Sequence, residues 1–107
     1  MQVLLKALIL PLFWLSTAAV AEVPDALRRA ELVRLVRQDC GSCHGMTLQG
    51  GLGSPLLPAS LRDKPAASLV ATILGGRPGT PMPPWQQFVS ESEAAWIVEQ
   101  LMTEFPQ

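Results

Sequence analysis

The chain has 107 residues, of which 49% are hydrophobic and 16% charged, and its formal net charge at neutral pH is −1. A chain of this length forms at most one small domain. Such a domain buries little apolar surface and often needs a covalent link or a bound group for stability. Only one lysine follows residue 21, and there is no basic stripe to neutralise phosphates, which excludes a nucleic-acid partner.

The first segment has the layout of a secretory signal peptide. Residues 1–21 combine one early positive charge, Lys6, with an apolar run over 7–15 and a small-residue exit that ends at Ala21. Cleavage is predicted before Glu22, which leaves one domain over 22–107. An uncleaved membrane anchor is the alternative, but the apolar run is short for a span of about 20 residues. We therefore expect no permanent membrane anchor.

The next segment predicts a helix over 26–39. Asp25 is a suitable N-cap, because a carboxylate accepts the free N–H groups at a helix start. Leu32, Leu35 and Val36 recur at helical spacing and lead to Cys40 on the same face. The arginines of this helix fall elsewhere, and they fit a solvated surface better than a docking patch.

The helix leads into Cys40-Gly41-Ser42-Cys43-His44, a C-x-x-C-H motif. This pattern is typical of covalent haem attachment, in which two thiols add to two vinyl groups and the histidine binds the iron. A disulfide, a thioredoxin-like couple or a zinc site are the other readings. The couple needs a βαβ context that is absent, and zinc needs four ligands, whereas the chain has two cysteines and one histidine. We expect one covalently bound haem c.

Two loops and a helix follow the motif. Residues 45–58 contain four glycines and two prolines, which predicts a long irregular loop able to approach a flat cofactor closely. A helical pattern resumes from Ser60 to Leu74, with Pro65 tolerated in its first turn. A proline-rich loop over 77–85 then restricts the backbone around Met82.

The last helix begins at a recognisable signal. Ser90 and Glu93 form an S-x-x-E capping box, and an apolar stripe then continues to Phe105 before Pro106 stops it. No strand pattern of any length occurs, so the predicted fold class is all-α.

A six-coordinate haem needs a second axial ligand, and no second histidine is present. Met46 follows His44 too closely to reach the other face of the ring. Met102 lies on the apolar stripe of the last helix, where methionine is usually part of the core. Met82 stands in a loop 38 residues after His44, which is ample chain to cross the ring edge. The sequence favours Met82, whose soft thioether would raise the reduction potential.

The order of these elements, with the runs RQDCGSCHGMTLQGGLG and ILGGRPGTPMPPW, resembles the class I cytochromes c. It is most similar to the small periplasmic monohaem cytochromes of the c-55X type, which accompany cytochrome cd nitrite reductase in denitrifying bacteria. The resemblance implies a small all-α fold of three main helices and long loops around one haem. It also implies thioethers at Cys40 and Cys43, axial ligation by His44 and Met82, and a hydrogen bond from His44 to the Pro55 carbonyl oxygen.

The resemblance further implies a periplasmic one-electron carrier rather than an enzyme, because two protein ligands leave no substrate position on the iron. Its partner would be a periplasmic nitrite reductase, to which it would donate electrons, and we expect a monomer. The alternative is an accessory role in the biosynthesis or maturation of the d-type haem of that reductase.

The loops expected around the haem edge, 46–57 and 78–85, carry no charge. We therefore predict an apolar docking patch with charged residues at most on its rim. Its members would include Leu48, Leu52, Pro81 and Pro83.

Overall fold

A computed structural model of the chain describes residues 4, 11–14 and 23–107. The predicted cleavage site between Ala21 and Glu22 lies outside these residues. None of the helices within the described ranges is long and apolar enough to cross a membrane. In chain order the helices are α1 (Ala26–Leu35), the π-helical turn η1 (Val36–Cys40), α2 (Gly41–His44), α3 (Pro58–Leu61), α4 (Ala66–Gly75) and α5 (Glu91–Thr103).

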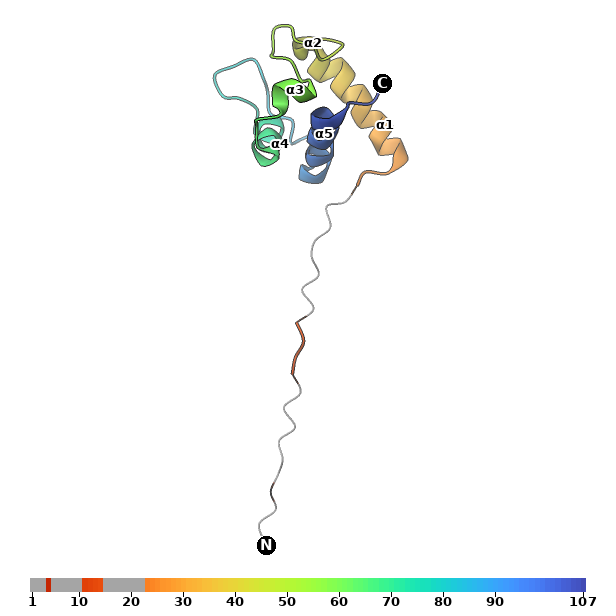
Figure 1. The fold of residues 1–107 in the computed structure, drawn as a ribbon, viewed down its shortest axis with the longest axis vertical. Helices are drawn as coiled ribbons and strands as arrows, with labels where there is room; N and C mark the ends of the chain where they lie inside the picture. Colours follow the sequence, from red (N-terminus) through yellow and green to blue (C-terminus); the bar gives the residue numbers. More distant parts are fainter. Residues whose placement is uncertain (1–3, 5–10, 15–22) are drawn as a thin grey trace.

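The helices form three main bodies, as predicted (Figure 1). The first is one continuous rod in which α1, η1 and α2 follow each other without a break. The other two are α4 and α5, and α3 is a single turn. The described residues contain no strand, so the all-α prediction is confirmed.

Two predicted helix boundaries differ from the structure. The helix expected over 26–39 continues to His44 and changes from α to π geometry on the way. The helix expected over 60–74 is two helices, because Pro65 is the extended N-cap of α4 (φ −61°, ψ 132°) and not part of its first turn. Proline lacks an N–H group and disfavours helical geometry in the residue before it, so α3 ends first.

The core lies between the first rod and the last helix. Leu32 and Val36 are fully buried, and they belong to one cluster with Ile97 and Leu101 of α5. In Figure 1, α5 lies between α1 and α4. Phe105 follows the end of α5 but is still buried, at 7% exposure, so its predicted core position is correct although its predicted helical state is not.

Arg28 joins the beginning of α1 to the beginning of α5. Its guanidinium pairs with the Glu93 carboxylate and donates a hydrogen bond of 2.8 Å to the Phe88 carbonyl oxygen. Glu93 is also part of the predicted capping box, because its carboxylate accepts from the Ser90 N–H and its own N–H donates to the Ser90 hydroxyl. The hydrogen bond from Arg28 lowers the pKa of Glu93 to about 2.

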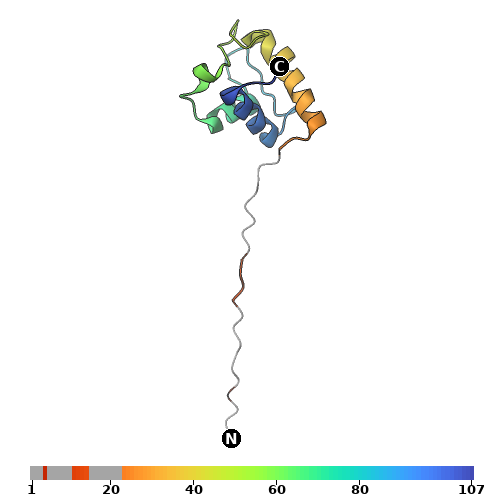
Figure 2. The ribbon, with the colours of Figure 1, turned by 45° about the vertical axis from the view of Figure 1, so that its right-hand side comes forward.

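The C-terminal end lies beside the first rod, as both ribbon views show (Figure 2). Arg37 of η1 donates a hydrogen bond of 2.7 Å to the Pro106 carbonyl oxygen. The same guanidinium lies over the Phe105 ring, 5.2 Å from its centroid. Arg28 and Arg37 are therefore structural contacts, which corrects the expectation that the arginines of this helix only line a solvated surface.

Candidate haem site

His44 ends α2 with its ring held in one orientation. Its Nδ1 lies 2.6 Å from the Ser54 carbonyl oxygen. A carbonyl can only accept, so Nδ1 carries the proton and Nε2 keeps a lone pair for a metal. Gly53 lies against the ring so closely that a Cβ atom there would be 2.7 Å from the ring atoms Cε1 and Nδ1. The imidazole therefore has the tautomer and the fixed orientation of a metal ligand.

The acceptor for His44 was predicted to be Pro55, and the structure assigns it to the residue before. Pro55 instead packs against Gly50, where a built Cβ would be 3.2 Å from the proline Cγ. A proline favours extended backbone in the residue before it, so Pro55 helps to present the Ser54 carbonyl group. The predicted acceptor was therefore in the correct part of the glycine-rich loop, but the carbonyl group that accepts is that of Ser54 and not that of Pro55.

The glycine-rich loop closes over the end of α2. The Gly53 N–H donates to the Cys43 carbonyl oxygen at 2.7 Å, and the Gly50 N–H donates to that of His44 at 2.8 Å. Both carbonyls belong to the last turn of a helix, where no intrahelical partner is available. Gly45 has a φ of +91°, and a Cβ there would come within 2.6 Å of the Gly50 carbonyl oxygen, so only glycine fits this return of the chain.

The two cysteines of the motif are half-buried, and neither forms a disulfide. Burial raises the pKa of the Cys40 thiol to about 11, with a smaller contribution from the Asp39 carboxylate. Within the described ranges, no three His, Cys, Asp or Glu side chains gather where they could hold a metal ion. Both thiols are therefore free of a disulfide, and the Cys43 sulfur accepts only a long hydrogen bond of 3.9 Å from the Ser42 hydroxyl.

Met82 is half-buried in a tightly closed loop after α4. The Arg77 N–H donates to the Met82 carbonyl oxygen at 3.1 Å. Inside this closure, the Thr80 hydroxyl donates to the Arg77 carbonyl oxygen at 2.6 Å and accepts from the Met82 N–H at 3.3 Å. Gly76 has a φ of +67°, and a Cβ there would be 2.8 Å from the Met82 carbonyl oxygen. The backbone of Met82 is thereby fixed from several sides.

The other described methionines lie where the sequence placed them. Met46 is 65% exposed and its Sδ lies near Gly41, 3.8 Å from a Cβ built on that residue. Met102 is half-buried and packs against the core from α5. Neither position favours an alternative to Met82.

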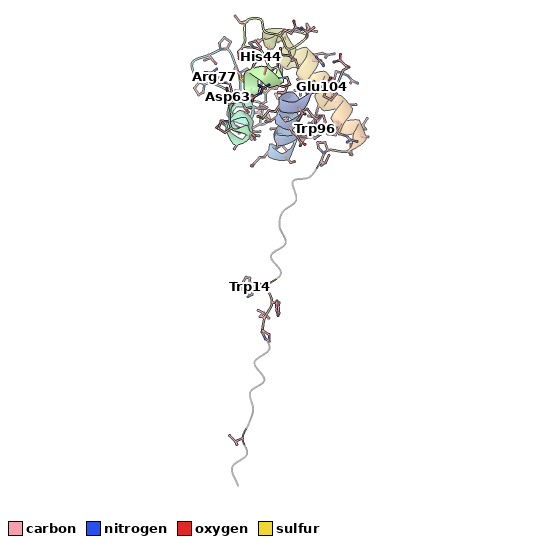
Figure 3. All side chains as sticks on the ribbon, viewed as in Figure 1. Trp14, His44, Asp63, Arg77, Trp96 and Glu104 are labelled. Atoms are coloured by element: carbon pink, nitrogen blue, oxygen red, sulfur yellow. The ribbon has the colours of Figure 1, made fainter. Side chains whose placement is uncertain are left out.

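One face of α4 is apolar and incompletely covered. Although α4 is apolar in composition, it has no buried residue, and its core-facing side chains are only half-buried: Leu69, Val70, Ile73 and Leu74. Figure 3 shows His44 in the upper part of the domain, Arg77 on the loop to its left and Trp96 on α5 below. Two thiols, an oriented imidazole, a soft thioether and an open apolar surface fit a haem.

One residue expected on the docking patch is buried. Leu48 is 2% exposed and belongs to the core cluster, and the Leu56 N–H donates to its carbonyl oxygen at 2.9 Å. Its φ of +62° turns the side chain inward. Leu52 is 81% exposed, and Pro81 and Pro83 are also exposed, as predicted.

An all-α fold with a C-x-x-C-H motif at the end of its first rod is that of a class I c-type cytochrome. In agreement, the family described as cytochrome C oxidase, cbb3-type, subunit III, matches residues 28–100. Cytochrome c55X of Pseudomonas aeruginosa is 59% identical over 81 residues, which cover 76% of this chain and 68% of the relative. Cytochrome c55X of Paracoccus denitrificans is 48% identical over 95 residues, which cover 89% and 92%. The chain belongs to the cytochrome c55X family, which confirms the resemblance.

The comparison with solved structures agrees. A structure described as c-type cytochrome NirC matches with a TM-score of 0.73 and 58% identity, and the match covers 74% of this chain and 93% of that one. A second match, to dihydro-heme d1 dehydrogenase NirN in complex with DHE, has a TM-score of 0.62 and 36% identity. It covers 69% of this chain but only 16% of the dehydrogenase. A module similar to this chain thus makes up a small part of a larger enzyme.

Proposed function

We propose that this protein is an exported, non-enzymatic one-electron carrier with one haem. Cys40 and Cys43 hold the haem through thioether bonds, and His44 and Met82 are its axial ligands. The haem supplies a ferric–ferrous couple, and a methionine thioether favours the ferrous state. The observation that carries this proposal is the hydrogen bond between His44 Nδ1 and the Ser54 carbonyl oxygen, since it leaves Nε2 as the free nitrogen.

A mass measurement tests this assignment directly. The purified mature protein should have the mass of residues 22–107 plus one haem, and denaturation in acidic organic solvent should not release the haem. A Cys40→Ala, Cys43→Ala double variant should lose the bound haem. A mass that includes residues 1–21 would contradict the proposed cleavage and leave the haem assignment standing. Haem that is extracted intact from the native protein would contradict covalent attachment.

The proposed location is the periplasm, and the proposed electron acceptor is the cytochrome cd nitrite reductase that accompanies cytochromes of this family. The surface available for such a partner is the uncharged face of the two loops, where Leu52, Pro81 and Pro83 are exposed. The charged residues nearest to these loops in sequence, Arg62 and Arg77, are exposed: Arg77 directly precedes the second loop, and Arg62 follows the first loop after α3. Stopped-flow mixing of the reduced protein with the purified reductase tests the donor role.

The likeness to a dihydro-heme d1 dehydrogenase favours a second candidate function in making the d-type haem. The P. aeruginosa enzyme is 48% identical to this chain over 48 residues, which cover 45% of this chain and 10% of the enzyme. A dehydrogenase must pass on two electrons for each substrate that it oxidises, so each turnover would reduce two molecules of a one-electron carrier. Reduction of the ferric protein by the dehydrogenase and its substrate, without transfer to the nitrite reductase, would support this role over the first.

A further inference from the structure

The rod that carries the haem-attachment motif contains one more residue than a regular helix would. Across η1 the Gly41 N–H donates to the Val36 carbonyl oxygen, five residues earlier, and this bond defines a π turn. Upstream, the Val36 N–H bonds to the carbonyl oxygens of Leu32 and Val33, which is ordinary α and tight-turn geometry. The irregular turn ends at Cys40, the first residue of the motif.

The extra residue changes which side of the rod the motif occupies. Each residue of an α-helix turns the chain by about 100°, so removing one residue would rotate everything downstream by about that angle relative to α1. The buried positions record this offset. Leu32 and Val36 are four apart, as on an α-helical face, but the next buried residue, Gly41, is five further on.

Neither end of the rod can rotate to absorb such a change. Upstream, Leu32 and Val36 are fully buried against the residues of α5. Downstream, α2 is held by the hydrogen bonds that its last residues, Cys43 and His44, make with the glycine-rich loop. The relative rotation of the two ends is therefore set by the turn between them.

Two further contacts hold the turn in its π geometry. The Ser42 hydroxyl donates to the Asp39 carbonyl oxygen at 2.8 Å, within the segment where regular helical bonding changes. Arg37 fixes the middle of the turn to the C-terminal tail through Pro106 and the Phe105 ring. Gln38, between these anchored residues, is exposed.

We propose that the η1 π turn is the positioning element for covalent haem attachment: its extra residue rotates the motif Cys40–His44 relative to α1, so that the motif can face the haem while the core face of α1 stays packed. This inference rests on the proposed attachment through both cysteines. It assigns a role to the five residues Val36–Cys40 as a unit, and Arg37 is the side chain that anchors the unit.

The test compares deletion of Gln38 with the substitution Gln38→Ala, which keeps the residue count. The readout is the absorption band of the haem in alkaline pyridine, because each unreacted vinyl group extends the conjugated system and moves the band to longer wavelength. We expect Gln38→Ala to give the two-thioether spectrum in native amounts. Deletion should give at least about tenfold less doubly attached protein, since small misplacements of reacting groups have effects of this order.

A second measurement on the native protein decides the case in which the deletion variant does not accumulate. In the reduced, diamagnetic protein, the scalar coupling across the hydrogen bond should join the Gly41 amide nitrogen to the Val36 carbonyl carbon. Coupling to Arg37 instead, or a deletion variant with two thioethers in native amounts, would overturn the proposal. A native protein that itself lacks two thioethers would contradict the proposed function and this inference with it, whereas the two outcomes above overturn the inference and leave the proposed function standing.

Discussion

The Arg28 guanidinium and the Glu93 carboxylate join the first turns of α1 and α5, the two helices that enclose the core. Because the same carboxylate completes the capping box of α5, the pair holds the helix start and the interhelical contact together. The ion pair is partly exposed, with side-chain exposures of 34% for Arg28 and 17% for Glu93.

The ion pair between Arg28 and Glu93 should make the free energy of unfolding depend on pH. The pKa of Glu93 is lowered from 4.5 to about 2, so its contribution is fully present above pH 4.5 and is lost as the pH falls through about 2. We expect Glu93→Gln to lower the free energy of unfolding by about 1 kcal/mol at neutral pH and to flatten its decline in this acid range. Urea unfolding at a series of pH values measures both. Glu99→Gln, an exposed change on the same helix, should leave the profile unaltered.

Removal of Met82, the proposed distal ligand, should change the iron more than the fold. Met82→Ala is expected to keep the covalent haem but to lower the reduction potential, because the thioether that favours ferrous iron is lost. Small ligands such as cyanide should then bind readily. Redox titration and ligand-binding spectra check this. The exposed Met46, changed to Ala, is the matched control, and an unaltered potential in Met82→Ala would show that another residue is the ligand.

A methyl group at Gly53 should disturb the proximal histidine. The added Cβ would lie 2.7 Å from the His44 ring, inside van der Waals contact, so the ring or the loop must move. We expect Gly53→Ala to lose about 1–3 kcal/mol of stability and to alter the spectrum of the haem. Gly75→Ala, where nothing lies within 4 Å of the added atom, should be neutral or slightly stabilising. If the two variants had the same stability and the same haem spectrum, Gly53 would not be the residue that fixes the imidazole.

Electron transfer to the partner should depend little on salt. The uncharged loops offer Leu52 as an apolar contact, and apolar contacts are not screened, whereas charge steering falls steeply as ionic strength rises. We expect Leu52→Ser to slow the second-order rate and Leu27→Ser, equally apolar and 74% exposed on α1, to leave it unchanged. A rate that drops by about tenfold between low and physiological salt would instead indicate a charged interface.

The sequence predicted correctly the features that depend only on residues close together in the chain. The C-x-x-C-H motif, the capping box at Ser90 and the irregular loop after His44 each depend on residues that are neighbours in the chain. The all-α fold followed from the helical spacing of apolar residues, because a stripe at that period can be buried only by packing against another element.

The differences arise where distant segments decide the outcome. The inward turn of Leu48 and the choice of the Ser54 carbonyl depend on how the loop closes over α2, which no local pattern encodes. The π turn has no signal in the sequence, because Leu32, Val36 and Cys40 keep a four-residue spacing and the five-residue step from Val36 to buried Gly41 is visible only in the structure. The break at Pro65 could have been predicted, because proline is favoured at the start of a helix and disfavoured in the interior of one that runs over 60–74.

The half-covered face of α4 has a consequence for the life of the chain before its haem is attached. A helix with an apolar face and no buried residue is weakly held, and weakly held segments open often enough for proteases to reach them. The same surface can adhere to other unfinished chains. If the proposed thioether bonds hold the haem against this face, attachment would remove both hazards at once. Molecules that fail to acquire haem should therefore be degraded rather than accumulate, so that the pool of this protein consists of chains able to carry an electron.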